Sequence, residues 1–117
     1  MQHAKKIEVV LSGVALAVTL SAPAVSYAAS ACTTGVGSSV VGNTASFVKD
    51  TFTPKCSAGV NVNYTQSSSA ISVNAAHPSG MHTFGGTSEG GGVIQCESSS
   101  VTNPTPLTPA AATNGCA

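Results

Sequence analysis

The sequence predicts an all-β protein, a small antiparallel sheet or sandwich with Gly/Ser-rich loops that two disulfides staple together. Three observations predict it. Apolar and polar residues alternate along two neighbouring stretches, which is the period of a β-strand. No window after the first 28 residues shows a 3.6-residue apolar repeat with helix caps. Four cysteines, an even number, follow an N-terminal segment typical of exported proteins.

The strongest strand pattern covers residues 59–66 (GVNVNYTQ) and 70–77 (AISVNAAH). The polar residues between the two stretches suit a hairpin connection in length and composition. Strict alternation also predicts that one face of each strand is buried, and that this is the apolar face. The apolar residues are Val60, Val62 and Tyr64 in the first strand, and Ile71, Val73 and Ala75 in the second.

Weaker patterns predict three further strands, at residues 45–52, 81–84 and 92–96. The sequence His-Pro-Ser-Gly at 77–80 favours a turn. Residues 85–92 (GGTSEGGG) predict a flexible hairpin loop, or a place where two subunits pack closely. They do not match a phosphate-binding loop, since Val93 and Ile94 stand where such a loop needs Lys and Ser or Thr.

Residues 1–28 have the three parts of a secretory signal peptide, namely two lysines, a short apolar run and small residues before the cut. Ser26 and Ala28 fit the small-x-small rule, so we expect cleavage before Ala29. An uncleaved membrane anchor is the alternative, but the apolar run has 12 residues where a span needs about 20. The mature chain would then reside in the periplasm, at the cell surface or outside the cell.

The composition divides the rest of the chain into two parts. Residues 29–97 form a small β domain with a Gly/Ser-rich lead-in, and residues 98–117 form a tail rich in Pro, Thr and Ala. Such a tail is typical of an extended, O-glycosylated stalk or of an unmodified polyproline-like linker, which Cys116 would pin.

Cysteine pairing is expected to supply stability that the core cannot. Only 15 of the 89 residues after Ala28 are Val, Ile, Leu or Phe, so little apolar surface is available for burial. In an oxidising compartment the four cysteines should pair. Three pairings are possible, and we favour Cys32 with Cys56 and Cys96 with Cys116, because partners near in sequence meet more often. The spacings contain no C-x-x-C, which argues against zinc or redox catalysis.

Charge excludes several partners. Residues 29–117 carry two lysines, one aspartate and two glutamates, a net charge of −1 with histidines neutral. No basic cluster exists for nucleic acid, and no second apolar stretch predicts a membrane span after signal cleavage. An uncharged surface rich in Ser, Thr, Asn and Gly opposes self-association less than a charged one does, so copies of itself or other surface proteins are the expected partners.

No metal, cofactor or catalytic site is predicted, and we expect no enzyme activity. His77 and His82 lie five residues apart and could share a metal with Glu89 or Glu97, but their spacing matches no known ligand motif. One serine, Ser88, stands in a G-x-S-x-G match at residues 86–90, but no helical pattern follows it, as a nucleophile elbow requires. The acidic residues, which are Asp50, Glu89 and Glu97, have no spacing typical of a catalytic pair.

Two segments resemble a group of small exported proteins of Gram-negative bacteria whose activity is uncharacterised. They are FTPKCSAGV at residues 52–60 and TFGGT at residues 83–87, with the strand pair between them. The resemblance covers roughly residues 45–96 and implies a periplasmic or cell-surface location, with no functional residue to carry over. The chain is also similar in style to pilus subunits, although it is shorter and has no donor-strand segment.

Two classes of function follow from these observations. The first is an exported structural or adhesive protein of the cell surface, including a self-assembling subunit, because its strand edges could pair between copies. The second is a secreted monomeric binding module, such as an inhibitor or toxin, because the chain is small and rich in cysteine. An exported enzyme is disfavoured beside both.

Overall fold

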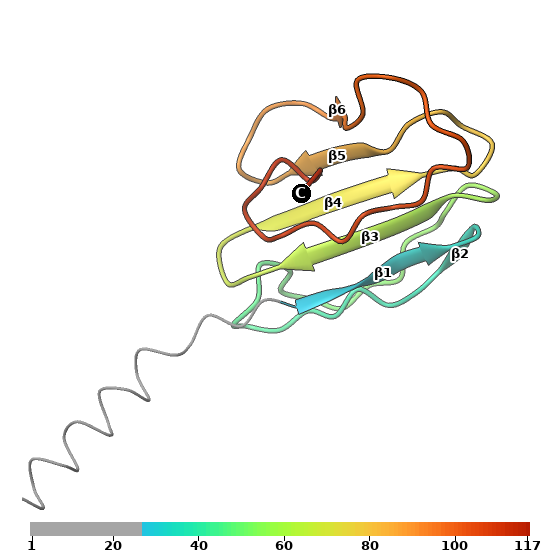
Figure 1. The fold of residues 1–117 in the computed structure, drawn as a ribbon. Coiled ribbons are helices and arrows are strands. Elements are labelled where there is room, and N and C mark those ends of the chain that lie inside the picture. The colour runs from blue at the N-terminus through green and yellow to red at the C-terminus, as the bar shows by residue number, and fades with distance from the viewer. Residues whose placement is uncertain (1–26) are drawn as a thin grey trace, which may run out of the picture.

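The computed structural model describes residues 27–117, which form one six-stranded antiparallel sheet and contain no helix. The predicted signal peptide lies outside this range except for its last two residues, Tyr27 and Ala28. The spatial order is β2-β1-β3-β4-β5-β6 (Figure 1). The predicted all-β fold is therefore confirmed. The strands are β1 (Tyr27–Thr33), β2 (Val36–Gly37), β3 (Asn61–Gln66), β4 (Ile71–Ala76), β5 (Phe84–Thr87) and β6 (Ile94–Gln95).

The central pair, β3 and β4, is the hairpin that the alternating pattern predicts. Its register places Tyr64 opposite Val73 and Asn63 opposite Asn74. Directly opposed residues share a face of a sheet. One face, here called the apolar face, therefore carries Val62, Tyr64, Ile71 and Val73. The other, here called the polar face, carries Asn63, Thr65, Ser72 and Asn74.

Strands β1 and β2 lie where the sequence predicts only a Gly/Ser-rich lead-in. A tight turn joins them, with Thr34 at φ 47° and Gly35 at φ 86°. β1 pairs with β3 over most of its length and shifts register between Ser30 and Cys32. The Ala and Ser residues at the centre of β1 carry little strand signal of their own, so it is the pairing with β3 that makes this segment a strand.

The predicted strand at residues 45–52 is wrong. This segment forms turns and bends, and its only ladder contact within the described chain is the isolated bridge between Val40 and Phe52. Its backbone bonds elsewhere, since the amide of Phe47 donates to the Ser67 carbonyl at 2.8 Å. The prediction failed because Phe and Val favour any half-buried surface and not strands alone. Here they lie in irregular chain that covers the sheet.

The glycine-rich stretch begins as strand and only later becomes a loop. Strand β5 starts at Phe84, the last residue of the strand predicted at 81–84, and includes Gly85 and Gly86. A Cβ built on Gly85 would lie 2.7 Å from the Gly115 carbonyl carbon. At Gly85, two backbone segments of the same chain, β5 and the tail, therefore pack closely against each other. The turn at 77–80 and the short strand at 92–96 are confirmed, the latter as β6.

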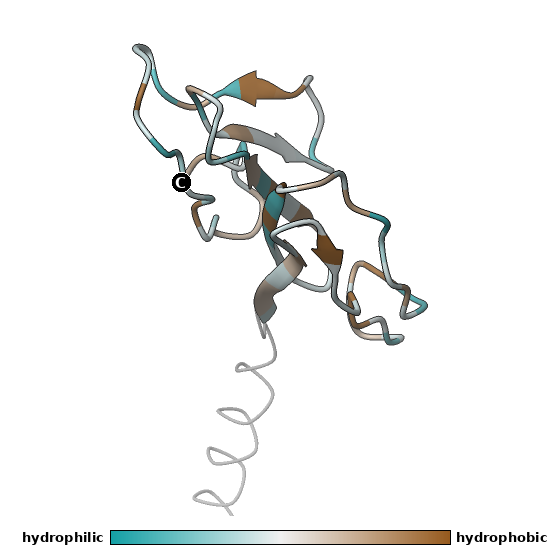
Figure 2. Cartoon of the chain, turned by 90° about the vertical axis from the view of Figure 1, so that its right-hand side faces the viewer, coloured by the Kyte–Doolittle hydropathy of each residue, from teal (hydrophilic) through white to brown (hydrophobic). Residues whose placement is uncertain are grey.

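Irregular chain covers both faces of the sheet (Figures 1 and 2). Residues 98–117, the C-terminal tail, cross the polar face, and residues 38–56 lie on the apolar face. The hydrophobic core lies on the apolar face, where Val62, Ile71 and Val73 pack against the buried cluster of Ala31, Val40 and Tyr64. The alternation does not predict that the polar face is buried too, with Ser72 and Asn74 fully inaccessible.

The two disulfides join the pairs that near-neighbour pairing favours, Cys32–Cys56 and Cys96–Cys116. The first links β1 to the end of the 38–56 segment. The second links the residue after β6 to the end of the tail. Each covering segment is therefore anchored to the sheet by one crosslink. The same crosslink restricts the conformations of the unfolded chain, which stabilises the folded state.

Candidate functional site

The polar face is occupied by the protein's own tail. The Asn74 side chain donates to the Gly115 carbonyl at 2.8 Å and accepts from the Leu107 amide at 2.8 Å. The Ser72 hydroxyl donates to the Thr113 carbonyl at 3.0 Å. These polar side chains satisfy backbone groups that irregular chain cannot pair internally, so this face is a structural interface and not an open site.

The apolar face is covered over only part of its width. Gln66 holds the covering segment, because its side chain donates to the Val41 carbonyl at 2.7 Å and accepts from the Val48 amide at 3.0 Å. Both bonds are made at the C-terminal end of β3, a central strand of the sheet. The part of the apolar face formed by β4 and β5, with Val73, Ala75 and Phe84 on it by register, receives no such anchor among residues 27–117.

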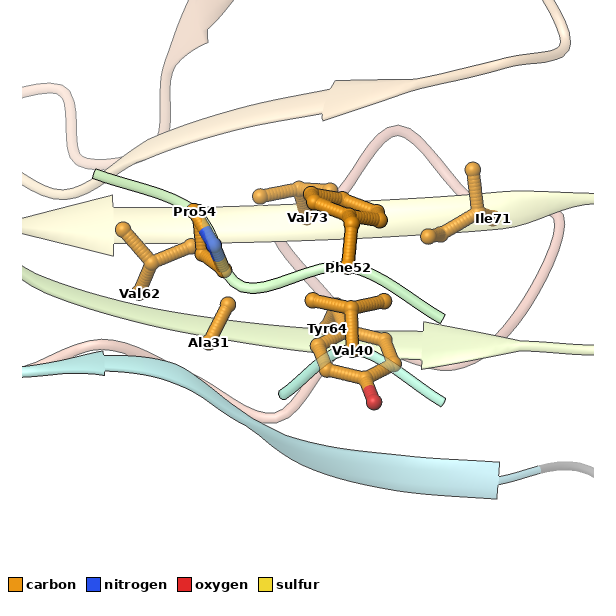
Figure 3. Close-up of a pocket in the computed structure, with 8 residues that line it drawn as sticks. All are labelled: Ala31, Val40, Phe52, Pro54, Val62, Tyr64, Ile71 and Val73. Atoms are coloured by element: carbon orange, nitrogen blue, oxygen red, sulfur yellow. The ribbon is translucent and has the colours of Figure 1, made fainter. Parts of the chain in front are cut away.

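An apolar groove of about 110 Å³ lies between the covering segment and the sheet. Figure 3 shows Phe52 and Pro54 above the strands, with Val62, Val73 and Ile71 along its floor. Ala31, Val40 and Tyr64 complete the lining. Every group that lines the groove is a hydrocarbon surface or an aromatic ring, so it suits an apolar side chain and not a charged or strongly polar ligand.

Large apolar side chains remain exposed on the apolar face and on the segment that covers it. Phe52 is 51 % exposed and Phe84 is 44 % exposed, and Phe47 and Val41 of the covering segment are also exposed. Monomeric proteins rarely leave large apolar patches uncovered, and those that occur mark interaction surfaces. The apolar face is therefore the best candidate for a functional surface in the described chain.

One polar cluster, formed by Thr83, Glu97 and His82, matches no sequence motif. The Glu97 carboxylate accepts bonds from both the Thr83 amide at 2.7 Å and the Thr83 hydroxyl at 2.6 Å. These bonds, the hydroxyl first, lower the pKa of Glu97 below its ordinary value. His82 Nδ1 lies 3.6 Å from Glu97 Oε1. Because Thr83 is buried and bonded, this cluster fixes the start of β5 and offers no free nucleophile.

The candidate metal ligands do not converge. His82 lies beside Glu97, whereas His77 packs against Gly59 and accepts the Ser79 amide at its Nδ1. Glu89 lies in the turn after β5. Among residues 27–117 there is no group of three or more His, Cys, Asp or Glu side chains placed to hold a metal ion.

Asp50 is exposed in the covering segment, far along the chain from both glutamates. No helix within residues 27–117 has the length and apolarity to cross a membrane. The four cysteines are all consumed by the two disulfides.

Comparisons with protein-family models, with curated proteins and with solved structures find no match for this chain. The resemblance carried by residues 52–60 and 83–87 stays a prediction. In the structure those two segments contribute the groove residues Phe52 and Pro54 and the strand residue Phe84.

Proposed function

We propose that this chain is an exported structural or adhesive subunit that associates with copies of itself through the apolar face of its sheet. One observation carries the proposal. The half-covered apolar face leaves Phe52 exposed at a groove lined by apolar groups, and Phe84 exposed on the same face of the sheet. Burying such groups on a second copy is favourable at roughly 25 cal/mol for each Å² of apolar surface removed from water.

The electrostatics support a second copy as the occupant. Only five charged side chains occur in residues 27–117, with a net charge of −1. Two copies therefore approach one another with almost no long-range repulsion. The same scarcity leaves little to attract a highly charged partner, whether nucleic acid or an acidic surface. Two disulfides support an oxidising, exported location, in which such a subunit would reach the cell surface.

Size-exclusion chromatography with light scattering on the oxidised mature protein tests the proposal. We expect the mean mass to rise above that of a monomer as concentration increases. Phe84→Thr should lower the extent of association, because it removes an exposed ring from the apolar face while keeping a strand-forming residue. Leu107→Thr is the matched control, since Leu107 is 40 % exposed but belongs to the tail on the opposite face.

A monomer at every concentration, for the unsubstituted protein, would contradict the proposal. That result would favour the second function class, a secreted monomeric binding module that uses the groove for a different partner. Association that responds equally to Phe84→Thr and Leu107→Thr would support assembly but not through the apolar face.

A further inference from the structure

Two residues assigned by sequence pattern to the signal peptide belong to the folded sheet. Tyr27 pairs with Gln66, and Ala28 pairs with Thr65. On their other side, Thr65 and Gln66 pair with β4. A chain that began at Ala29 would therefore leave the last two residues of β3 on an open sheet edge, where backbone groups lack strand partners.

The side chain of Tyr27 also covers the core. Its ring lies edge-on to that of Tyr64, with the centroids 6.2 Å apart and the planes at 63°. This is a favourable aromatic geometry. Tyr64 is only 1 % exposed, so removal of Tyr27 would uncover a side chain that the fold keeps from water.

The affected edge lies at an anchoring point of the fold. Gln66, whose backbone pairs with Tyr27, is the residue whose side chain binds Val41 and Val48 of the covering segment. Loss of its strand partner would loosen the part of β3 that holds the 38–56 segment in place. The sheet therefore uses Tyr27 and Ala28 in the same way as it uses the rest of β1.

Two small-x-small sequences precede these residues, Ala22-Pro23-Ala24 and Ala24-Val25-Ser26, and only the first has the A-x-A form. A signal peptidase accepts small residues at the first and third positions before the bond that it cuts. We propose that export cleaves the bond between Ala24 and Val25, so that Tyr27 and Ala28 remain in the mature sheet. Water is added across this amide, which leaves a carboxylate on Ala24 and an amine on Val25. The inference rests on the export included in the proposed function.

Intact mass of the exported protein tests the inference. The full chain is produced in a Gram-negative host, and the soluble periplasmic and secreted material is analysed under denaturing, non-reducing conditions. We expect a chain that starts at Val25. A start at Tyr27 or at Ala29 would overturn the proposed cut and leave export standing, whereas a full-length chain found in the cytoplasm and absent from the exported material would overturn both.

Paired substitutions sharpen the test. Ala24→Leu places a large residue at the proposed cut and should abolish the normal product. Ala28→Leu places the same residue at the alternative cut, at an exposed position of β1, and should leave the product unchanged. Both are read from the mass of denatured protein, so neither result depends on folding. The reverse pattern would overturn the inference.

A comparison of two purified chains tests whether Tyr27 and Ala28 stabilise the sheet. Purified oxidised chains that start at Val25 and at Ala29 are compared by amide hydrogen exchange. We expect the shorter chain to lose protection at residues 64–66 and in the covering segment that Gln66 anchors, while β4 and β5 stay protected. Equal protection at residues 64–66 in the two chains would show that Tyr27 and Ala28 are dispensable to the sheet and would overturn the argument.

Discussion

Gln66 and Asn74 lie on opposite faces of the same hairpin, and each uses one buried side-chain amide to hold one covering segment to the sheet at two points. Gln66 binds the Val41 carbonyl and the Val48 amide. Asn74 binds the Gly115 carbonyl and, through its oxygen, the Leu107 amide. An amide can donate and accept at once, which a hydroxyl or an apolar side chain at these positions could not do in the same geometry.

The first prediction concerns the Asn74 anchor. Asn74→Ala should lower the free energy of unfolding by about 2 kcal/mol, because it leaves the buried Gly115 carbonyl without its donor. Urea unfolding of the oxidised protein measures the change. Asn63→Ala is the control, since Asn63 makes a single bond of 3.4 Å to Pro106 from a half-buried position. Equal losses from the two substitutions would contradict the anchoring role.

The second prediction concerns the glycine in the tail. Gly115 has φ 91°, and a Cβ there would lie 2.5 Å from both the Gly86 amide nitrogen and the Val73 carbonyl oxygen. Gly115→Ala should therefore displace the tail from β4 and β5. Gly91 is a matched control, with φ 79° and nothing within 4 Å of a built Cβ.

Gly91→Ala should cost only the backbone strain of a positive φ, about 1–2 kcal/mol. Gly115→Ala should cost clearly more, and thermal unfolding of the two variants measures the difference. If the two variants have the same melting temperature, the close packing of the tail on β5 is not part of the folded state.

The third prediction separates the two disulfides. In the chain-entropy model each loop of this size is worth roughly 3 kcal/mol. Replacing Cys96 and Cys116 together by Ala should free the tail, and protease should then cut first within residues 98–117. Replacing Cys32 and Cys56 should shift the first cuts to residues 38–56. Mass spectrometry of the fragments locates the cuts, and identical patterns from the two double variants would refute separate roles.

The fourth prediction concerns acid stability. The bonds from Thr83 hold the pKa of Glu97 below its ordinary value. A carboxyl whose pKa is lower in the folded state stabilises the fold above its unfolded pKa, which is about 4.3 for glutamate. That contribution is lost as the pH falls through the lower, folded pKa.

Urea midpoints between pH 7 and pH 3 should therefore fall less steeply for Glu97→Gln than for the unsubstituted protein. Thr83→Val removes the hydroxyl donor and should also flatten the pH dependence, though only in part, because the Thr83 amide still donates. An unchanged slope in Glu97→Gln would show that other carboxyl groups cause the acid sensitivity.

Much of the fold was predictable because its signals are local. The alternation in residues 59–66 and 70–77 sets the β3–β4 hairpin, whose side chains reach opposite faces whatever surrounds them. The cysteine pairing was predictable because sequence-near partners need only short loops to meet. The small residues of β1 carry no comparable signal, and only the edge of β3 makes them a strand.

The candidate site was only partly predictable. Phe52 and Phe84 stand out in the sequence as bulky residues in weak strand patterns, but their exposure follows from the tertiary packing and has no local signal. The Thr83–Glu97 cluster joins residues that are 14 apart in sequence and has no motif that could reveal it.

The sequence alone determined that this protein is a disulfide-linked β-sheet with few charges, because alternation, cysteine parity and composition are properties of the chain itself. The tertiary structure alone decided how each face is covered. Asn74 and Ser72 match the pattern of solvent-exposed strand residues, but the tail lies on them and their side chains bond to its backbone in place of water. On the other face Val73 lines the groove with Phe52 of the covering segment, whereas Phe84 stays 44 % exposed. Burial depends on which distant segment packs over a residue, and a local pattern does not contain that information.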